Sequence, residues 1–223
     1  MKNIPELIVM LTHNDKTVLD AIEVFESSID TKAKFWGFKE QPLPGDEMKK
    51  LVDMMKGAGK TTFLEVVEYG EKECLAGAQI AVDCGFDCLM GTLYFDSVLE
   101  LTKSAGLKYM PFVGEVSGRP SVLGGTIEGM IEEANELLKK GVDGFDLLGY
   151  RFTGDAVLLN SEFVKNVPAN VCLAGSVQSY ERLDEVKATG AWSFTIGGAF
   201  FESKFGDDGF AAQIDRVIDY MNR

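Results

Sequence analysis

The chain contains a single histidine, His13, and four cysteines, none of which forms a Cys-x-x-Cys pair. These residues cannot complete a common zinc-binding set. We therefore expect Cys74, Cys84, Cys88 and Cys172 to be small buried thiols, and we predict no metal site and no cofactor.

Basic residues are also scarce. The sequence has 22 Lys and Arg against 35 Asp and Glu, which gives a formal net charge of −13. Nucleic acids and anionic membranes require basic surface that replaces their counterions, so neither is expected as a partner. A protein this acidic must bind an anionic ligand through a few local donors, such as backbone amides.

Long apolar runs and linkers are missing as well. No apolar run approaches the roughly 20 residues that cross a bilayer, and no small-residue cleavage site follows the N-terminal MKNIPELIVML. We therefore expect a cytoplasmic protein. No proline- or serine-rich segment divides the chain and 46% of its residues are hydrophobic, which predicts a single folded domain over residues 1–223.

Residues 57–62, GAGKTT, look like a nucleotide-binding P-loop, but their context differs. A P-loop requires glycine at position 54, where this chain has Met54, and it follows a strand and precedes a helix. Here a helical pattern comes before the motif and a β-rich run comes after it. We interpret the motif as a glycine-terminated helix that leads into a strand.

Short apolar runs alternate with amphipathic helical patterns along the whole chain. The runs predict eight strands, at Glu6–Leu11, Lys34–Phe38, Thr61–Val66, Asp87–Met90, Lys108–Val113, Val142–Leu147, Asn170–Leu173 and Ser193–Ile196. The patterns between them predict eight helices, near residues 16–29, 46–57, 71–84, 94–105, 126–140, 159–166, 178–189 and 208–221. The strands are continuously hydrophobic, as is typical when helices cover both faces of a sheet.

This alternation predicts an α/β fold with a parallel sheet. Eight units in a chain of about this length match a single-domain (β/α)8 TIM barrel. Gly85, Gly106, Gly141 and Gly190 each follow a predicted helix, where a left-handed C-cap favours glycine. An open, doubly wound sheet is the main alternative, but it normally has a glycine fingerprint after its first strand, where this chain has THND at residues 12–15.

Glycine also follows the last two predicted strands, as Gly175-Ser176 and Gly197-Gly198. In a (β/α)8 barrel, the loops after strands seven and eight commonly hold a phosphate, because bare glycines let backbone N–H groups approach an anion. A tight turn explains either pair alone. Both pairs together favour phosphate binding.

The segments KKGVDGFDLLGYRFTGD (residues 139–155) and VCLAGSVQSYERLDEVKATGAWSFTIGGAFF (171–201) resemble the ribulose-phosphate-binding barrels. This superfamily includes the sugar-phosphate isomerases of histidine and tryptophan synthesis and N-acetylmannosamine-6-phosphate 2-epimerase. The resemblance implies the barrel fold and a phosphorylated ligand. It assigns no catalytic residue, because Ala174-Gly175-Ser176 has no acidic residue beside the glycine and Asp15 is displaced from the aspartate of the histidine-pathway isomerases.

The carboxyl ends of the predicted strands carry the candidate catalytic residues. Lys39 follows an aromatic strand, where an apolar wall is expected to lower its pKa. Glu65 lies inside an apolar strand, where its charge requires a partner, and Lys39 on the adjacent strand would satisfy both. A solvated lysine paired with Glu40 is the alternative for Lys39, and a purely structural ion pair is the alternative for Glu65.

Other candidates stand at neighbouring strand ends. Glu115 follows the fifth strand, and Asp146 and Arg151 flank the end of the sixth. Arg151 would bind a phosphate or carboxylate, and an ordinary salt bridge is the alternative for Asp146. His13, at the end of the first strand, is the one side chain whose usual pKa lies near neutrality, and it fits a catalytic or a structural role equally well.

Two further expectations concern the surface. Residues 115–125 form the longest connection without predicted structure, so we expect either a lid that closes over ligand, with Arg119 adding charge to the site, or an ordinary surface loop. The aromatic residues Trp192, Phe200, Phe201 and Phe205 suggest a homo-oligomer in which they pack between protomers, although internal packing explains them equally well.

The predicted function is a phosphosugar isomerase or epimerase acting on a small phosphorylated substrate. Such an enzyme removes a proton next to a carbonyl and stabilises the resulting enolate. Glu65 or Glu115 would be the base, and Lys39 would stabilise the enolate. The alternatives are a Schiff-base aldolase or lyase on a phosphorylated or keto-acid substrate, a decarboxylase with magnesium on Glu65 and Glu68, and a non-catalytic phosphometabolite-binding barrel.

Overall fold

The computed structural model of the protein describes residues 3–223. Eight parallel strands form its central sheet, in the order β10-β11-β12-β1-β4-β5-β6-β7. They are β1 (Glu6–Met10), β4 (Phe35–Lys39), β5 (Thr61–Val66), β6 (Cys88–Gly91), β7 (Lys108–Met110), β10 (Gly144–Leu147), β11 (Asn170–Leu173) and β12 (Ser193–Ile196). All eight predicted strands are present.

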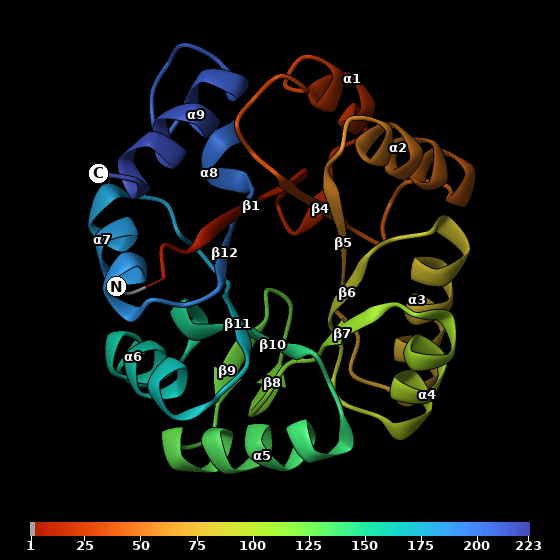
Figure 1. The fold of residues 1–223 in the computed structure, drawn as a ribbon, viewed down its shortest axis with the longest axis vertical. Coiled ribbons are helices and arrows are strands. Elements are labelled where there is room, and N and C mark those ends of the chain that lie inside the picture. Colours follow the sequence, from red (N-terminus) through yellow and green to blue (C-terminus); the bar gives the residue numbers. More distant parts are fainter. Residues whose placement is uncertain (1–2) are drawn as a thin grey trace.

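The sheet curls into a barrel whose two end strands meet. The amide of Asp143 donates to the carbonyl of Tyr109 at 2.9 Å, and the amide of Asp146 donates to the carbonyl of Pro111 at 3.1 Å, which joins β10 to β7. Figure 1 shows the resulting ring of strands with the helices outside it. The predicted (β/α)8 TIM barrel is therefore confirmed.

The outer ring consists of helices that each follow a barrel strand. They are α1 (Ala21–Glu26), α2 (Gly45–Gly57), α3 (Glu71–Cys84), α4 (Asp96–Ala105), α5 (Ile127–Lys140), α6 (Ala156–Asn166), α7 (Tyr180–Thr189) and α9 (Phe210–Met221), with a 3-10 turn η1 (Gly149–Arg151) and a short α8 (Gly198–Phe201). The four predicted glycine C-caps are all left-handed, with φ between 70° and 100°. Among residues 3–223, no helix combines the length and the apolar character that crossing a membrane requires.

The GAGKTT segment joins a helix to a strand, as predicted. Helix α2 ends at Gly57, β5 begins at Thr61, and Gly59 turns the chain with φ +73°. The segment therefore lies at the amino end of a barrel strand, away from the carboxyl ends where barrel active sites form.

Two helix predictions missed the first residue by three or more positions. The helix expected from residue 16 starts only at Ala21, because Asn14 and Asp15 adopt left-handed φ angles of 51° and 59° and turn the chain into a two-residue hairpin of β2 (Thr12–His13) and β3 (Lys16–Thr17). Asn and Asp favour such turns. Helix α6 starts three residues earlier than expected, because the Asp155 side chain accepts a hydrogen bond from the Leu158 amide and caps it.

The connection at residues 115–125 was wrongly expected to lack structure. It contains an antiparallel hairpin, β8 (Glu115–Ser117) and β9 (Val122–Gly124). The amide of Thr153 donates to the carbonyl of Leu123 at 3.0 Å and ties the hairpin to the segment after β10.

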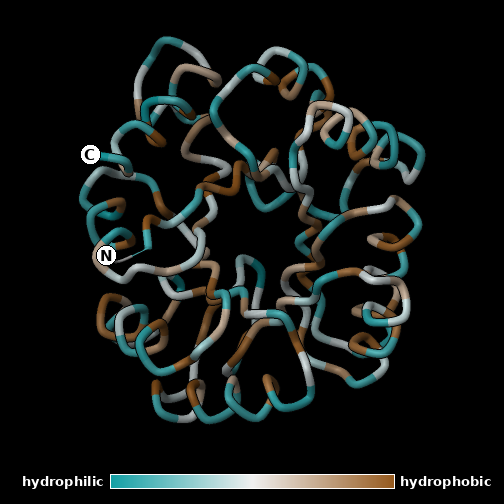
Figure 2. The backbone as a smooth tube through the Cα atoms, viewed as in Figure 1, coloured by the Kyte–Doolittle hydropathy of each residue, from teal (hydrophilic) through white to brown (hydrophobic). Residues whose placement is uncertain are grey.

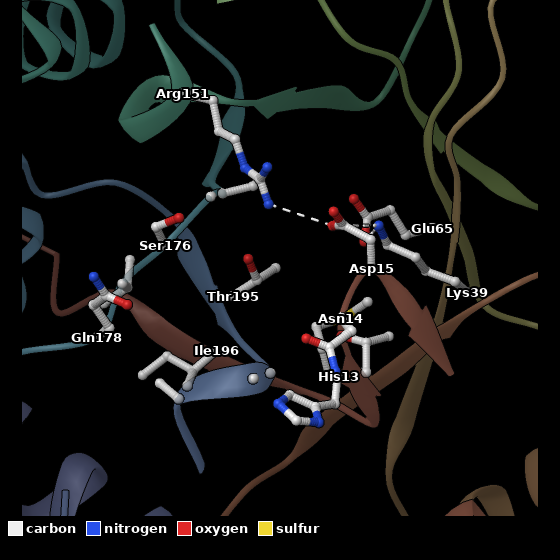
Figure 3. Close-up of a pocket in the computed structure, with 18 of the residues that line it drawn as sticks. His13, Asn14, Asp15, Lys39, Glu65, Arg151, Ser176, Gln178, Thr195 and Ile196 are labelled. Carbon is white, nitrogen blue, oxygen red and sulfur yellow. Dashed lines mark hydrogen bonds and ion pairs between the residues drawn. The ribbon is translucent and has the colours of Figure 1, made fainter. Parts of the chain in front are cut away.

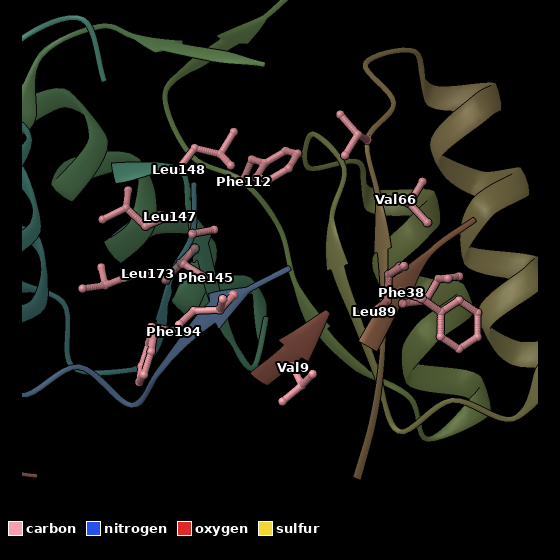
Figure 4. Close-up of a cluster of buried hydrophobic side chains, with 14 of the residues drawn as sticks. Val9, Phe38, Val66, Leu89, Phe112, Phe145, Leu147, Leu148, Leu173 and Phe194 are labelled. Carbon is pink, nitrogen blue, oxygen red and sulfur yellow. The ribbon is translucent and has the colours of Figure 1, made fainter. Parts of the chain in front are cut away.

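The apolar core has two parts, one on each side of the strands. A smaller cluster fills the barrel interior and includes Ile8, Phe63, Met90 and Cys172. A larger cluster packs the outer faces of the strands against the helices, and Figure 4 shows part of it. Figure 2 shows that hydrophilic residues gather on the outer turns of the helices. All four cysteines are free and buried, as predicted.

Internal packing, one of the two explanations given for the aromatic residues, is the one that the contacts support. Phe200 and Phe205 are each only 2% exposed and pack against each other at 5.8 Å between ring centroids. Trp192 packs against Phe35 at 5.4 Å, and Phe201 against Phe210 at 4.8 Å. Internal packing accounts for these rings, so they give no support to an oligomer.

Candidate functional site

A cavity of about 260 Å³ opens at the carboxyl ends of the barrel strands. Figure 3 shows polar side chains from several strand ends turned toward it. Its lining includes the polar or charged residues Thr12, His13, Asp15, Lys39, Glu65, Arg151, Ser176, Gln178 and Thr195. We call this cavity the central pocket.

Lys39 and Glu65 form one wall of the central pocket. They occupy paired positions on β4 and β5, so both side chains point into the barrel. The Lys39 ammonium lies 3.9 Å from a Glu65 carboxylate oxygen, and the two side chains are only 12% and 13% exposed. The ion pair expected between these residues is present.

The expected direction for the pKa of Lys39 is wrong. Burial acts to lower this pKa, but the carboxylates of Glu65, Asp15 and Glu40 raise it more, so the net pKa lies above its usual value. Lys39 is therefore an ammonium ion at neutral pH, suited to hydrogen bonding and to stabilising negative charge.

Asp146 on β10 is fully buried in the barrel interior. Neither of its carboxyl oxygens has a hydrogen-bond partner among the described residues. Burial raises its pKa well above the usual value, the charge of Glu65 raises it further, and Lys39 opposes both effects. The environment thus favours the protonated carboxyl, and Asp146 interacts electrostatically with both wall residues.

Asp15 lies at the tip of the β2–β3 hairpin and joins two cations. Its carboxylate is 3.4 Å from the Lys39 ammonium and 3.3 Å from the Arg151 guanidinium. Arg151 reaches it from η1, on the opposite side of the pocket (Figure 3). The hairpin therefore brings to the pocket the aspartate that looked displaced in the sequence.

The two glycine loops form the wall that faces Lys39 and Glu65. Gly175 and Ser176 have left-handed φ angles of 88° and 57°. A Cβ atom on Gly197 would lie 2.5 Å from the Thr12 hydroxyl, so only glycine fits there. No described residue accepts a hydrogen bond from the amides of Ser176 or Gly198. This wall thus offers free N–H donors to a ligand.

His13 lies beside the second glycine loop. Its ring stacks on Phe201 of α8 with 5.7 Å between centroids, and its Nε2 is 3.5 Å from a Glu202 carboxylate oxygen. A Cβ atom on Gly198 would lie 3.5 Å from the imidazole Cδ2. His13 is therefore positioned to contact a ligand held by Gly198.

Two predicted catalytic residues do not line the central pocket: Asp146, which is fully buried in the barrel interior, and Glu115. Glu115 is exposed on β8 of the second hairpin, whose Ser121 lines the pocket instead. Glu68 pairs with Arg119 at 2.8 Å and does not line the pocket with Glu65. Within residues 3–223, no three His, Cys, Asp or Glu side chains gather in an arrangement that suits a metal ion.

Several pocket residues were not singled out from the sequence. They are Asn14, Ser121, Gln178, Thr195 and Glu202. The sequence could have indicated Thr195, because it lies two residues after Ser193 and so places a second polar residue on the same face of the strand. The others stand in turns and loops, where no periodic pattern indicates direction.

The sequence matches no protein-family model and no curated protein. Solved structures match it in fold. The tryptophan synthase alpha chain from Legionella pneumophila superposes with a TM-score of 0.66 at 12% identity, over 98% of this chain and 92% of that chain. The N-acetylmannosamine-6-phosphate 2-epimerase from Clostridium perfringens gives 0.63 at 14% identity, over 87% and 86%. A 4-hydroxy-2-oxoglutarate/2-dehydro-3-deoxyphosphogluconate aldolase gives 0.62 at 13% identity, over 96% and 94%.

These structural neighbours are barrel enzymes, and the names of two of them specify phosphorylated substrates. They include a synthase, an epimerase and an aldolase, so the shared fold does not fix one reaction. The resemblance carried by residues 139–155 and 171–201 is confirmed at the level of the fold.

Proposed function

We propose that the protein is a phosphosugar isomerase or epimerase that works through an enolate or enediolate intermediate. One observation carries this proposal above the others. The ion-paired Lys39 and Glu65, 3.9 Å apart, face a wall of free backbone amides across a single pocket. The acid–base groups would therefore contact one end of a small molecule, and the anion site would bind its other end.

In this reaction Glu65 takes the proton from the carbon next to the substrate carbonyl. The electron pair of the broken C–H bond forms the enolate, whose oxygen carries the negative charge. The Lys39 ammonium donates a hydrogen bond to this oxygen and stabilises the charge as it develops. Return of the proton from Glu65 to the former carbonyl carbon, with transfer of the neighbouring hydroxyl proton to the enolate oxygen, completes an isomerisation. An epimerisation instead requires a second acid, on the opposite face of the same carbon, to supply the proton.

Asp146 lies in the barrel interior and influences this step through its charge state. Burial and the charge of Glu65 raise its pKa, which disfavours a second negative charge beside Glu65.

The substrate phosphate would occupy the opposite wall. The amides around Gly175, Ser176, Gly197 and Gly198 donate to its oxygens, and Arg151 adds a charged donor from η1. These local donors suit a protein of net charge −13, which attracts no anion through its overall field. The ligand is thus a small phosphorylated metabolite, and we infer that the enzyme is cytoplasmic.

A Schiff-base aldolase remains the second candidate, because an aldolase shares the fold. That reaction needs a neutral lysine amine. The raised pKa of Lys39 works against this role and favours the enolate mechanism.

Hydrogen–deuterium exchange tests the proposal. The protein is incubated in D2O with a panel of aldose and ketose phosphates, and NMR follows the C–H next to the carbonyl. We expect exchange with at least one compound, and a loss of about 10²- to 10⁴-fold in Glu65→Gln. Glu115→Gln, outside the pocket, is the matched control and retains full exchange.

The alternatives give different results. Covalent trapping at Lys39 by borohydride in the presence of substrate would indicate the aldolase. Binding of inorganic phosphate without exchange of any compound would indicate a phosphometabolite-binding barrel. Equal exchange rates in wild type and Glu65→Gln would refute the assignment of the base.

A further inference from the structure

A second cavity, of about 320 Å³, adjoins the central pocket. It lies between the β2–β3 hairpin and the β8–β9 hairpin, and we call it the hairpin chamber. Asn14, Asp15, Lys39 and Ser121 line both cavities. A substrate that places its carbonyl at Lys39 thus has room to extend into the chamber, away from the glycine loops.

Hydrogen bonds fix the first wall of the chamber to the barrel. The Thr17 hydroxyl donates to the carbonyl of Lys39 and accepts from the amide of Lys39, both at 2.8 Å. The Thr17 amide donates to the carbonyl of Gln41 at 2.9 Å. The β2–β3 hairpin therefore holds its position against the end of β4 without a ligand.

The opposite wall is fixed in the same way. The Tyr69 hydroxyl donates to the carbonyl of Gly118 at 2.8 Å and lies 2.9 Å from the Ser121 hydroxyl. Arg119 pairs with Glu68 at 2.8 Å. The chamber is thus preformed, which lowers the entropic cost of binding a ligand in it.

The chamber offers a cation that no described carboxylate pairs with. Three cations, Lys16, Lys39 and Arg119, line it together with the carboxyls of Asp15 and Glu40. Within residues 3–223, no carboxylate lies within 4.0 Å of the Lys16 ammonium. Burial raises the pKa of Glu40. Lys39 is paired with Asp15 and Glu65, and Arg119 with Glu68, so Lys16 is the chamber cation whose charge no described ion pair offsets.

We propose that the hairpin chamber binds a second anionic group, carried by the end of the substrate remote from its phosphate. The substrate is then a phosphorylated sugar acid or a sugar bisphosphate. Lys16 and Arg119 donate to the second anion, while the loops after β11 and β12 hold the first. We call the loops after β11 and β12 the first anchor, and Lys16 with Arg119 the second anchor. This inference extends the proposed function and rests on it for the first anchor.

Matched pairs of ligands test this inference by calorimetric titration at fixed ionic strength. 6-Phosphogluconate and glucose 6-phosphate differ in a distal carboxylate, and fructose 1,6-bisphosphate and fructose 6-phosphate differ in a distal phosphate. We expect the doubly anionic member of at least one pair to bind about tenfold more tightly to the wild type, the effect of one to two charge-assisted hydrogen bonds. Inorganic phosphate reports on the first anchor alone.

Two charge-matched variants locate the second anchor. Lys16→Gln/Arg119→Gln should remove the preference for the doubly anionic ligand and leave the affinity for inorganic phosphate unchanged. Lys50→Gln/Arg223→Gln removes the same charge from exposed positions outside both cavities and should keep the preference. Lys16→Gln alone removes no described ion pair, so it should not disturb the fold. We expect this variant to lose part of the preference for the doubly anionic ligand.

The outcomes separate the two proposals. If inorganic phosphate binds but neither distal anion improves affinity, the second anchor is wrong and the phosphate site stands. A preference that survives in Lys16→Gln/Arg119→Gln also overturns the chamber assignment. Failure of the wild type to bind inorganic phosphate overturns the proposed function itself, and the two-anchor substrate with it.

Discussion

The buried carboxyl of Asp146 makes the stability of the barrel depend on pH, and Asp146→Asn isolates that dependence. The side chain is 0% exposed and its oxygens have no described partner. Burial and the charge of Glu65 raise its pKa in the folded protein above the value of about 3.9 that an unfolded chain gives it. Asparagine has nearly the same shape and does not ionise.

Proton linkage gives the sign and the size of the change in the free energy of unfolding with pH. Below pH 3.9 the carboxyl is protonated in both states, so wild type and variant differ by a constant. Between the unfolded and the folded pKa, only the unfolded chain releases the proton, and the wild type loses about 1.4 kcal/mol of stability per pH unit relative to Asp146→Asn. Above the folded pKa the difference is constant again.

Urea unfolding of both proteins at a series of pH values from 4 to 8 measures this difference. Contributions of the other titrating groups are common to the two proteins and cancel where they do not interact with Asp146. A difference that stays flat across this range would refute the reasoning, because it would mean that Lys39 keeps the native carboxyl ionised. A comparison in the Glu65→Gln background adds a further check. Removal of that charge lowers the folded pKa of Asp146, so the sloping region must end at a lower pH.

Three further results are expected. Gly175→Ala should weaken inorganic phosphate binding about tenfold in calorimetry by displacing the loop amides. Gly85→Ala introduces a side chain at a similar φ in open space, so it should lose about 1 kcal/mol of stability and no phosphate affinity. Tyr69→Phe should speed amide hydrogen exchange in residues 115–124, because the hydroxyl holds the tip of that hairpin; unchanged exchange would contradict a fixed chamber wall. Glu65→Gln should slow deuterium exchange at every pH, and an unchanged rate would show that another group is the base.

The sequence determined the barrel because its signals are local. Each apolar run specifies a strand, each amphipathic pattern specifies a helix, and glycines such as Gly85 and Gly141 terminate helices within a few residues of chain. Because the strands are parallel, their carboxyl ends lie on one side of the barrel. Lys39, Glu65, Gly175 and the other strand-end residues must therefore lie around the same opening. The paired positions of Lys39 and Glu65 follow from the neighbouring strands alone.

The hairpins were beyond sequence reasoning because their patterns are short. Two residues per strand in β2 and β3 give no periodicity, and the helical pattern from residue 16 outweighed the turn signal of Asn14-Asp15. The same limit concealed β8 and β9 and left Glu115 assigned to the site.

Only the tertiary structure decided which charges meet. Asp15 reaches Lys39 across 24 residues of sequence and Arg151 across 136. The charges of Glu65, Asp15 and Glu40 outweigh the effect of burial and reverse the direction expected for the pKa of Lys39. Sequence patterns report what a residue prefers for its own backbone and its own face of a strand or helix. Electrostatic interactions depend instead on distances between side chains from different strands, and those distances exist only after the ring of strands has closed.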